Sequence, residues 1–94
     1  NNEQYLLNKL GEEGKEVGLV AQSYVFGLDS NDNGNLPKTN KEHLFQELND
    51  FLATIELLNE ECDFGFTPCQ EAINAKKEKI KKYREISKKL GHTQ

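Results

Sequence analysis

The sequence contains no tryptophan or methionine and only two prolines and two cysteines, and its apolar residues make up 35% of the total. No apolar run approaches the ~20 residues of a membrane-spanning helix, and no charged-then-apolar leader precedes the first helical pattern. Cys62 and Cys69 do not form a CxxC pair, and neither histidine lies at zinc-ligand spacing from them. We therefore expect a cytoplasmic protein with reduced thiols and no membrane partner.

Charged residues are plentiful, at 30%, although the formal net charge is only −4. Residues 1–75 carry 4 basic and 14 acidic side chains, whereas residues 76–94 carry 8 basic and 2 acidic ones. A basic segment can bind nucleic acid. The acidic majority would repel a phosphate polymer, so we expect no nucleic-acid partner.

A chain of 94 residues is expected to form one domain over 1–94. A chain this short buries only about 60–65% of its unfolded surface, which leaves a thin core. Apolar residues also lie on more than one face of the predicted helices. We therefore expect a homodimer or homotetramer.

Two long helices are predicted in the first two thirds of the chain. Apolar residues recur at helical spacing over residues 3–27 and again over 41–61. Turn-forming residues, DSNDNGNLPKTN, separate them at 29–40. Asn40 is predicted to cap the second helix.

A third, basic helix is predicted after a turn at residues 62–68. Thr67 and Pro68 suit an N-cap and first-turn pair, and Gly91 is expected to end the helix after Leu90. No segment has the pattern of a strand. We therefore expect an all-α fold, a small helical bundle in which the first two helices pack antiparallel and the third closes the site.

A carboxylate interrupts the apolar stripe of the first predicted helix. Glu13 occupies a position where the helical repeat predicts an apolar residue. Glu16 lies three residues later, on the same side, and Glu12 lies further round the helix. A carboxylate that faces a core is costly unless it is paired or binds a metal ion. Glu13 is therefore the most informative residue in the sequence.

The second predicted helix carries another acidic pair, Glu47 and Asp50. If the two helices pack by their apolar stripes, the pairs converge. Hard oxygen ligands suit Mg²⁺, for which Mn²⁺ can substitute, and a divalent ion supports phosphoryl chemistry. The alternative is that these residues are solvated surface acids of an acidic protein.

The ordered motifs EExxE and ExxD resemble those of the all-α nucleoside triphosphate pyrophosphohydrolases, which include MazG and the dimeric dUTPases. The segments LNKLGEEGKEVGLVAQ and HLFQELNDFLATIELL are similar to the two metal helices of short MazG-like proteins. FGFTPCQEAINAKKEKIKKY is similar to their third helix. The resemblance covers about residues 5–85.

The resemblance implies Mg²⁺-dependent hydrolysis of a (deoxy)nucleoside triphosphate to the monophosphate and pyrophosphate, as a nucleotide-pool or house-cleaning activity. It implies four metal ligands, namely Glu13, Glu16, Glu47 and Asp50. Glu12, which would support the ligands or orient water, and Glu13 are the implied catalytic carboxylates. Lys76 matches a phosphate-binding lysine of the third helix, and Lys79 is a second candidate for substrate binding.

Two other functions remain open. A non-catalytic helical interaction module would keep the fold without binding Mg²⁺. An EF-hand-like Ca²⁺ binder is suggested by DSNDNG at residues 29–34, although Asn40 replaces the glutamate at the twelfth loop position. That hypothesis predicts that Ca²⁺ affinity depends on Asp29, Asn31 and Asn33.

The remaining polar and aromatic side chains are interpreted as structural. His43 lies one turn before Glu47, where it could touch a substrate, but it is interpreted as an exposed or helix-start histidine. Tyr24 carries no separate signal. Phe66 is interpreted as a core or subunit contact.

Overall fold

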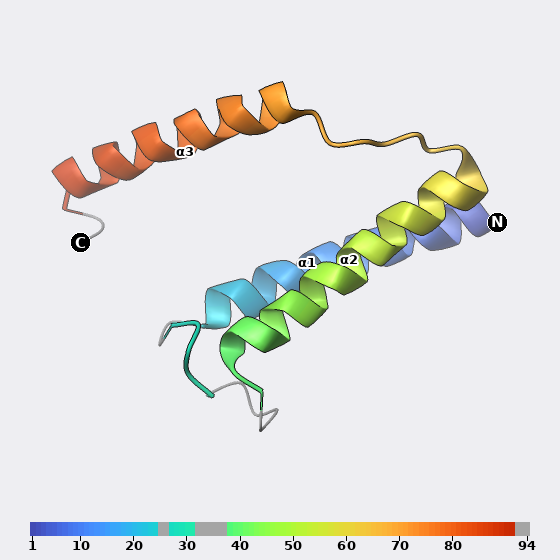
Figure 1. The fold of residues 1–94 in the computed structure, drawn as a ribbon, viewed down its shortest axis with the longest axis horizontal. Helices are drawn as coiled ribbons and strands as arrows, with labels where there is room; N and C mark the ends of the chain where they lie inside the picture. Colours follow the sequence, from blue (N-terminus) through green and yellow to red (C-terminus); the bar gives the residue numbers. More distant parts are fainter. Residues whose placement is uncertain (25–26, 32–37, 92–94) are drawn as a thin grey trace.

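The computed structural model describes residues 1–24, 27–31 and 38–91, and this part of the chain contains three α-helices and no strand. Helix α1 spans Asn2–Ser23, α2 spans Asn40–Cys62 and α3 spans Gln70–Lys89 (Figure 1). The predicted all-α class is confirmed. Helix α1 ends four residues earlier than predicted. No helix within these ranges combines the length and the apolar character needed to cross a bilayer.

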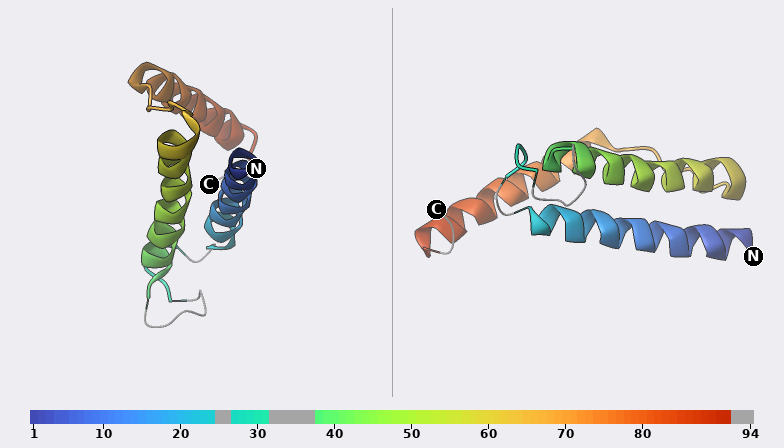
Figure 2. Two further views of the ribbon diagram at one scale, coloured as in Figure 1. Left: turned by 90° about the vertical axis from the view of Figure 1, so that its right-hand side faces the viewer. Right: turned by 90° about the horizontal axis from the view of Figure 1, so that it is seen from below.

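Helices α1 and α2 lie side by side and antiparallel (Figures 1 and 2). The start of α1 lies beside the end of α2, where Asn2 Nδ2 donates to Glu61 Oε1 at 3.0 Å. Among the described residues, Leu6 and Leu58 are the only buried apolar side chains, 6% and 1% exposed. The apolar contact within this helical hairpin of α1 and α2 is therefore narrow.

The start of α2 is fixed by a capping box and a buried asparagine. Thr39 Oγ1 accepts from the backbone N–H of Glu42 at 3.2 Å, and the Glu42 carboxylate accepts from the Thr39 N–H at 3.0 Å. This hydrogen bond from Thr39 lowers the pKa of Glu42. Asn40, which was predicted as the cap, is instead the first helical residue. Its side chain donates to the Gly27 carbonyl at 2.8 Å and its N–H to the Ser30 carbonyl at 2.7 Å, which ties the connection to α2.

The segment between α2 and α3, residues 63–69, turns back along α2. Asp63 adopts a left-handed conformation at the end of α2. The Asn59 side chain donates to the Phe66 carbonyl and accepts from the Phe66 N–H, both at 2.9 Å. A pocket of about 490 Å³ lies between α2 and this segment. It is lined by Asn49, Leu52, Ile55, Glu56, Asn59, Phe66 and Pro68.

Helix α3 projects away from the hairpin (Figures 1 and 2). No Cα atom of α3 lies within 8 Å of one in α1 or α2. The helix begins at Gln70, after Cys69, rather than at Thr67 and Pro68, and it ends as predicted before Gly91, whose φ is +75°. Within one chain, α3 does not close against the first two helices, which differs from the predicted arrangement.

The resulting shape is elongated, with extents of 47 × 37 × 19 Å. The radius of gyration is 16.6 Å, whereas a compact 94-residue domain is expected near about 12 Å. The accessible surface is 7488 Å², whereas a compact monomer of 10.7 kDa is expected to expose about 5,500 Å². The single chain therefore exposes far more surface than a compact protein of its size.

Candidate functional site

Three carboxylates meet between α1 and α2. One oxygen from each of Glu13, Glu47 and Asp50 lies within 4.8 Å of the others. Glu47 is buried, at 9% exposed, Glu13 is half-buried and Asp50 is exposed. Glu13 comes from α1 and the other two from adjacent turns of α2, so the packing of the hairpin assembles the group. The structure thus brings together three of the four predicted ligands.

The other acidic residues of the EExxE motif do not join this group. Glu16 is exposed and lies outside it. Glu12 is also exposed, and its Oε2 lies 3.3 Å from Lys9 Nζ. The hydrogen bond to Glu12 raises the pKa of Lys9. Exposed pairs of this kind contribute little to stability.

No lysine or arginine among the described residues lies at ion-pair distance from the three carboxylates, Glu13, Glu47 and Asp50. Lys9 attracts the Glu13 carboxylate only from a longer distance. Like charges this close repel one another, and burying the Glu47 carboxylate adds a desolvation cost. A divalent cation would offset both. Carboxylate oxygens are the ligands that Mg²⁺ and Mn²⁺ prefer, so the donor set fits such an ion.

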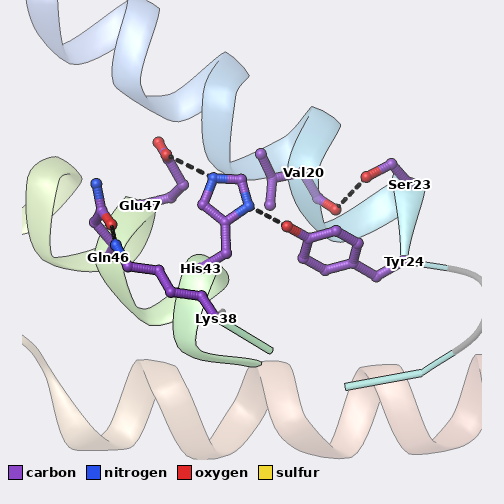
Figure 3. A network of polar contacts seen from close by, with 7 residues as sticks. All are labelled: Val20, Ser23, Tyr24, Lys38, His43, Gln46 and Glu47. Atoms are coloured by element: carbon purple, nitrogen blue, oxygen red, sulfur yellow. Dashed lines mark hydrogen bonds and ion pairs between the residues drawn. The ribbon is translucent and has the colours of Figure 1, made fainter. Parts of the chain in front are cut away.

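A histidine connects this group to the end of α1 (Figure 3). His43 Nε2 lies 3.4 Å from Glu47 Oε1, and Nδ1 hydrogen-bonds with the Tyr24 hydroxyl. The ring is thus hydrogen-bonded on the Tyr24 side and makes a longer polar contact on the Glu47 side. Polar partners of a ligating carboxylate help to orient it when a metal ion is bound. The interpretation of His43 as a helix-start residue is confirmed, because it lies in the first turn of α2, but its side chain is not exposed, with only 17% of it accessible.

The sequence contained one signal for this contact. His43 precedes Glu47 by four residues, a spacing that places two side chains together on a helix. The role of Tyr24 had no such signal, because it follows the last residue of α1 and reaches His43 only through the packing of the hairpin.

The predicted substrate-binding lysines lie elsewhere. Lys76 and Lys79 are exposed residues of α3, which does not approach α1 or α2. Within a single chain, the structure does not bring them to the carboxylates. The described residues of the EF-hand-like segment are not part of the group, and Asp29 and Asn31 are exposed. Asn33 lies outside the described residues.

Chemically, the hairpin presents a compact set of anionic oxygen ligands beside a histidine–tyrosine pair. Such a set can hold a divalent cation, which in turn can bind phosphate oxygens. The lysines that could bind further phosphate oxygens are remote within the chain. In comparisons with known proteins, no family model, curated protein or solved structure matches this chain.

Proposed function

We propose that this protein is a Mg²⁺-dependent nucleoside triphosphate pyrophosphohydrolase, in which Mn²⁺ can replace Mg²⁺. The observation that carries the proposal is the convergence of Glu13, Glu47 and Asp50 within 4.8 Å, with no lysine or arginine among the described residues at ion-pair distance. The order of these carboxylates along the two helices supports it, because it resembles that of the MazG-like enzymes.

In this proposal, Glu13, Glu47 and Asp50 bind the ion, and Glu16 is a fourth ligand from its exposed position one turn after Glu13. The bound ion would neutralise phosphate charge and increase the acidity of a water molecule. His43 holds the Glu47 carboxylate in place through its 3.4 Å contact.

The catalytic carboxylates are Glu12 and Glu13. Glu13 lies in the group, and Glu12 flanks it on the exposed side of α1, where its contact with Lys9 is exposed and weak. A carboxylate there can accept a proton from the water that attacks the triphosphate between its α and β phosphates. The products are the nucleoside monophosphate and pyrophosphate, which suits a cytoplasmic nucleotide-pool or house-cleaning role.

Self-association is part of the proposal, as a homodimer or homotetramer. Because α3 does not contact α1 or α2 of its own chain, Lys76 and Lys79 can contribute to phosphate binding only at the carboxylates of another copy. The exposed surface of about 7500 Å², well above the value expected for a compact monomer, supports an assembled state.

A non-catalytic interaction module is the second candidate function. The observation in its favour is the number of large apolar side chains that are exposed on all three helices, including Leu19 at 67%, Leu52 at 53% and Ile80 at 55%. A partner of another sequence would cover these residues in that case, and the carboxylates would be surface acids.

Product analysis distinguishes the two. The protein is incubated with each canonical and several modified NTPs and dNTPs, with Mg²⁺ or with EDTA, and the products are separated by ion-exchange chromatography. The proposal predicts equimolar monophosphate and pyrophosphate in Mg²⁺ and neither in EDTA. Release of orthophosphate and the nucleoside diphosphate would contradict the predicted cleavage between the α and β phosphates. No release from a folded sample would favour the interaction module.

A further inference from the structure

One face of α3 is apolar and uncovered. Ile73, Ile80, Tyr83 and Leu90 recur at intervals of seven, three and seven residues, which places them on one side of a helix. They are 38%, 55%, 57% and 63% exposed, respectively. An isolated helix gains stability chiefly by packing its apolar face, and α3 has no such contact with its own hairpin.

A second uncovered apolar surface lies on α2, facing away from α1. Phe45, Leu48 and Leu52 are 53%, 39% and 53% exposed. This row leads into the pocket whose other wall is formed by Phe66 and Pro68. The paired hydrogen bonds between Asn59 and Phe66 hold that wall in place. The result is a preformed apolar groove along the outer side of α2.

The two surfaces have complementary charge. Helix α3 carries 8 basic and 3 acidic residues, whereas α2 carries 6 acidic and 1 basic residue. Lys77 and Arg84 flank Ile80 at helical neighbour spacing, and Glu56 lines the groove, with Glu60 one turn later. Opposite charges along the rims of two apolar surfaces favour their association and set its orientation. Two α3 helices would repel each other instead.

The exposed area is sufficient for a stable assembly. The chain exposes roughly 2,000 Å² more than a compact monomer of its mass. A standard interface removes about 800 Å² from each partner, and obligate dimers bury about 2,000–5,000 Å² in total. A reciprocal exchange of two α3 helices uses both apolar surfaces of each chain, so it matches this excess.

We propose that α3 of one copy packs into the α2 groove of a second copy, and that the exchange is reciprocal. Ile80 and Tyr83 lie against Leu52, Phe66 and Pro68 of the other chain, and Lys77 and Arg84 lie beside its Glu56 and Glu60. This inference rests on the self-association proposed above and is independent of nucleotide hydrolysis. Because the groove lies on the side of α2 away from the carboxylates, the exchange does not by itself bring Lys76 and Lys79 to them.

Thiol cross-linking tests the exchange directly. Cys62→Ser and Cys69→Ser remove the native thiols, and the molar mass and helicity of this background are compared with those of the parent. Leu52→Cys is then placed in an affinity-tagged chain and Ile80→Cys in an untagged one. The two are mixed, refolded together and treated with a short bismaleimide. The proposal predicts a cross-linked species containing one tagged and one untagged chain, and none when the tagged chain carries Leu52→Asp in place of Leu52→Cys.

Each other outcome overturns the exchange. Cross-linking of Ile80→Cys chains to one another would show α3 packing on α3. Cross-linking only within a Leu52→Cys/Ile80→Cys double variant would show α3 folding onto its own hairpin. An oligomer without any cross-link would place the interface elsewhere. A parent with the 10.7 kDa mass of one chain would also contradict self-association, while pyrophosphate release would still be decided by its own assay.

Discussion

His43 and Glu47 face each other across one turn of α2, with His43 Nε2 3.4 Å from Glu47 Oε1. Because the Tyr24 hydroxyl engages the other ring nitrogen, the imidazole is held from both sides. Loss of a group that orients a metal ligand typically lowers metal affinity about 10–100-fold. We therefore predict that His43→Ala weakens Mn²⁺ binding by about that factor, as measured by titration calorimetry or by the electron paramagnetic resonance signal of free Mn²⁺.

Tyr24→Phe is a milder variant that tests the same contact. It keeps the ring packing and removes only the hydroxyl, so its effect on Mn²⁺ affinity should be smaller than that of His43→Ala. Unchanged Mn²⁺ affinity in His43→Ala, with normal helicity, would show that His43 does not position Glu47.

The carboxylate group makes a prediction about stability. A ligand that binds only the folded state at a hundred times its Kd raises the free energy of unfolding by about 2.7 kcal/mol. For a domain of this size, each kcal/mol corresponds to about 4–8 °C in Tm. Saturating Mg²⁺ or Mn²⁺ should therefore raise the Tm of the parent by about 10 °C or more, as followed by circular dichroism.

Glu13→Gln and Asp50→Asn should abolish most of that rise. Without metal, both variants should melt at or above the parent temperature, because each removes a charge from a repelling group. Glu56→Gln is the matched control, since Glu56 lies on the outer groove of α2. An equal metal response in Glu56→Gln and Glu13→Gln would show that the cation acts on general surface charge.

The carboxylate group was predictable because its signal is local. Glu13 interrupts a helical repeat, and the apolar stripes of two helices predict that it faces the side of α2 that carries Glu47. The exposure of Glu16 was harder to predict. Its direction differs from that of Glu13 by only about 60° around α1, yet Glu13 is half-buried and Glu16 is exposed.

The position of α3 could not be predicted in this way. Its apolar stripe is as regular as those of the other helices, but periodicity does not reveal which surface covers a helix. The direction of the chain after α2 depends on the left-handed Asp63 and on the bonds between Asn59 and Phe66. We identified no sequence pattern that predicts the hydrogen bonds between Asn59 and Phe66 or the groove that they help to form.

The contact between Asn59 and Phe66 makes its own prediction. Each net hydrogen bond contributes about 0.5–1.5 kcal/mol, and Asn59→Ala removes two of them. We expect segment 63–69 to detach, so that chymotrypsin cleaves after Phe64 or Phe66 several-fold faster than in the parent. Glu60→Ala, on the adjacent position of α2, is the control. Equal cleavage rates in Asn59→Ala and the parent would show that this contact does not hold the segment.

The glycines of α1 provide a test of the hairpin packing. A Cβ atom at Gly18 would meet nothing within 4 Å among the described residues, whereas one at Gly14 would lie 3.4 Å from Phe51 Cε1. Glycine inside a helix costs about 0.8–1.0 kcal/mol relative to alanine. Gly18→Ala should therefore raise the free energy of unfolding by about that amount.

The contact with Phe51 predicts a smaller gain for Gly14→Ala and a loss for Gly14→Leu, whose side chain would displace the ring. Urea unfolding of the three variants measures the differences. Destabilisation by Gly18→Ala would contradict the open surface described at this position.

Glu13 and Asp50 are proposed to hold a divalent cation for hydrolysis of a nucleoside triphosphate. The most direct test is the rate of Mg²⁺-dependent pyrophosphate release by the parent, Glu13→Gln, Asp50→Asn and the control Glu56→Gln, on a panel of NTPs and dNTPs. We expect release by the parent and by Glu56→Gln, and loss of most of the activity in the two site variants, which each lack one of the anionic ligands. Equal release by Glu13→Gln and the parent, or none from any nucleotide with folded parent protein, would contradict it.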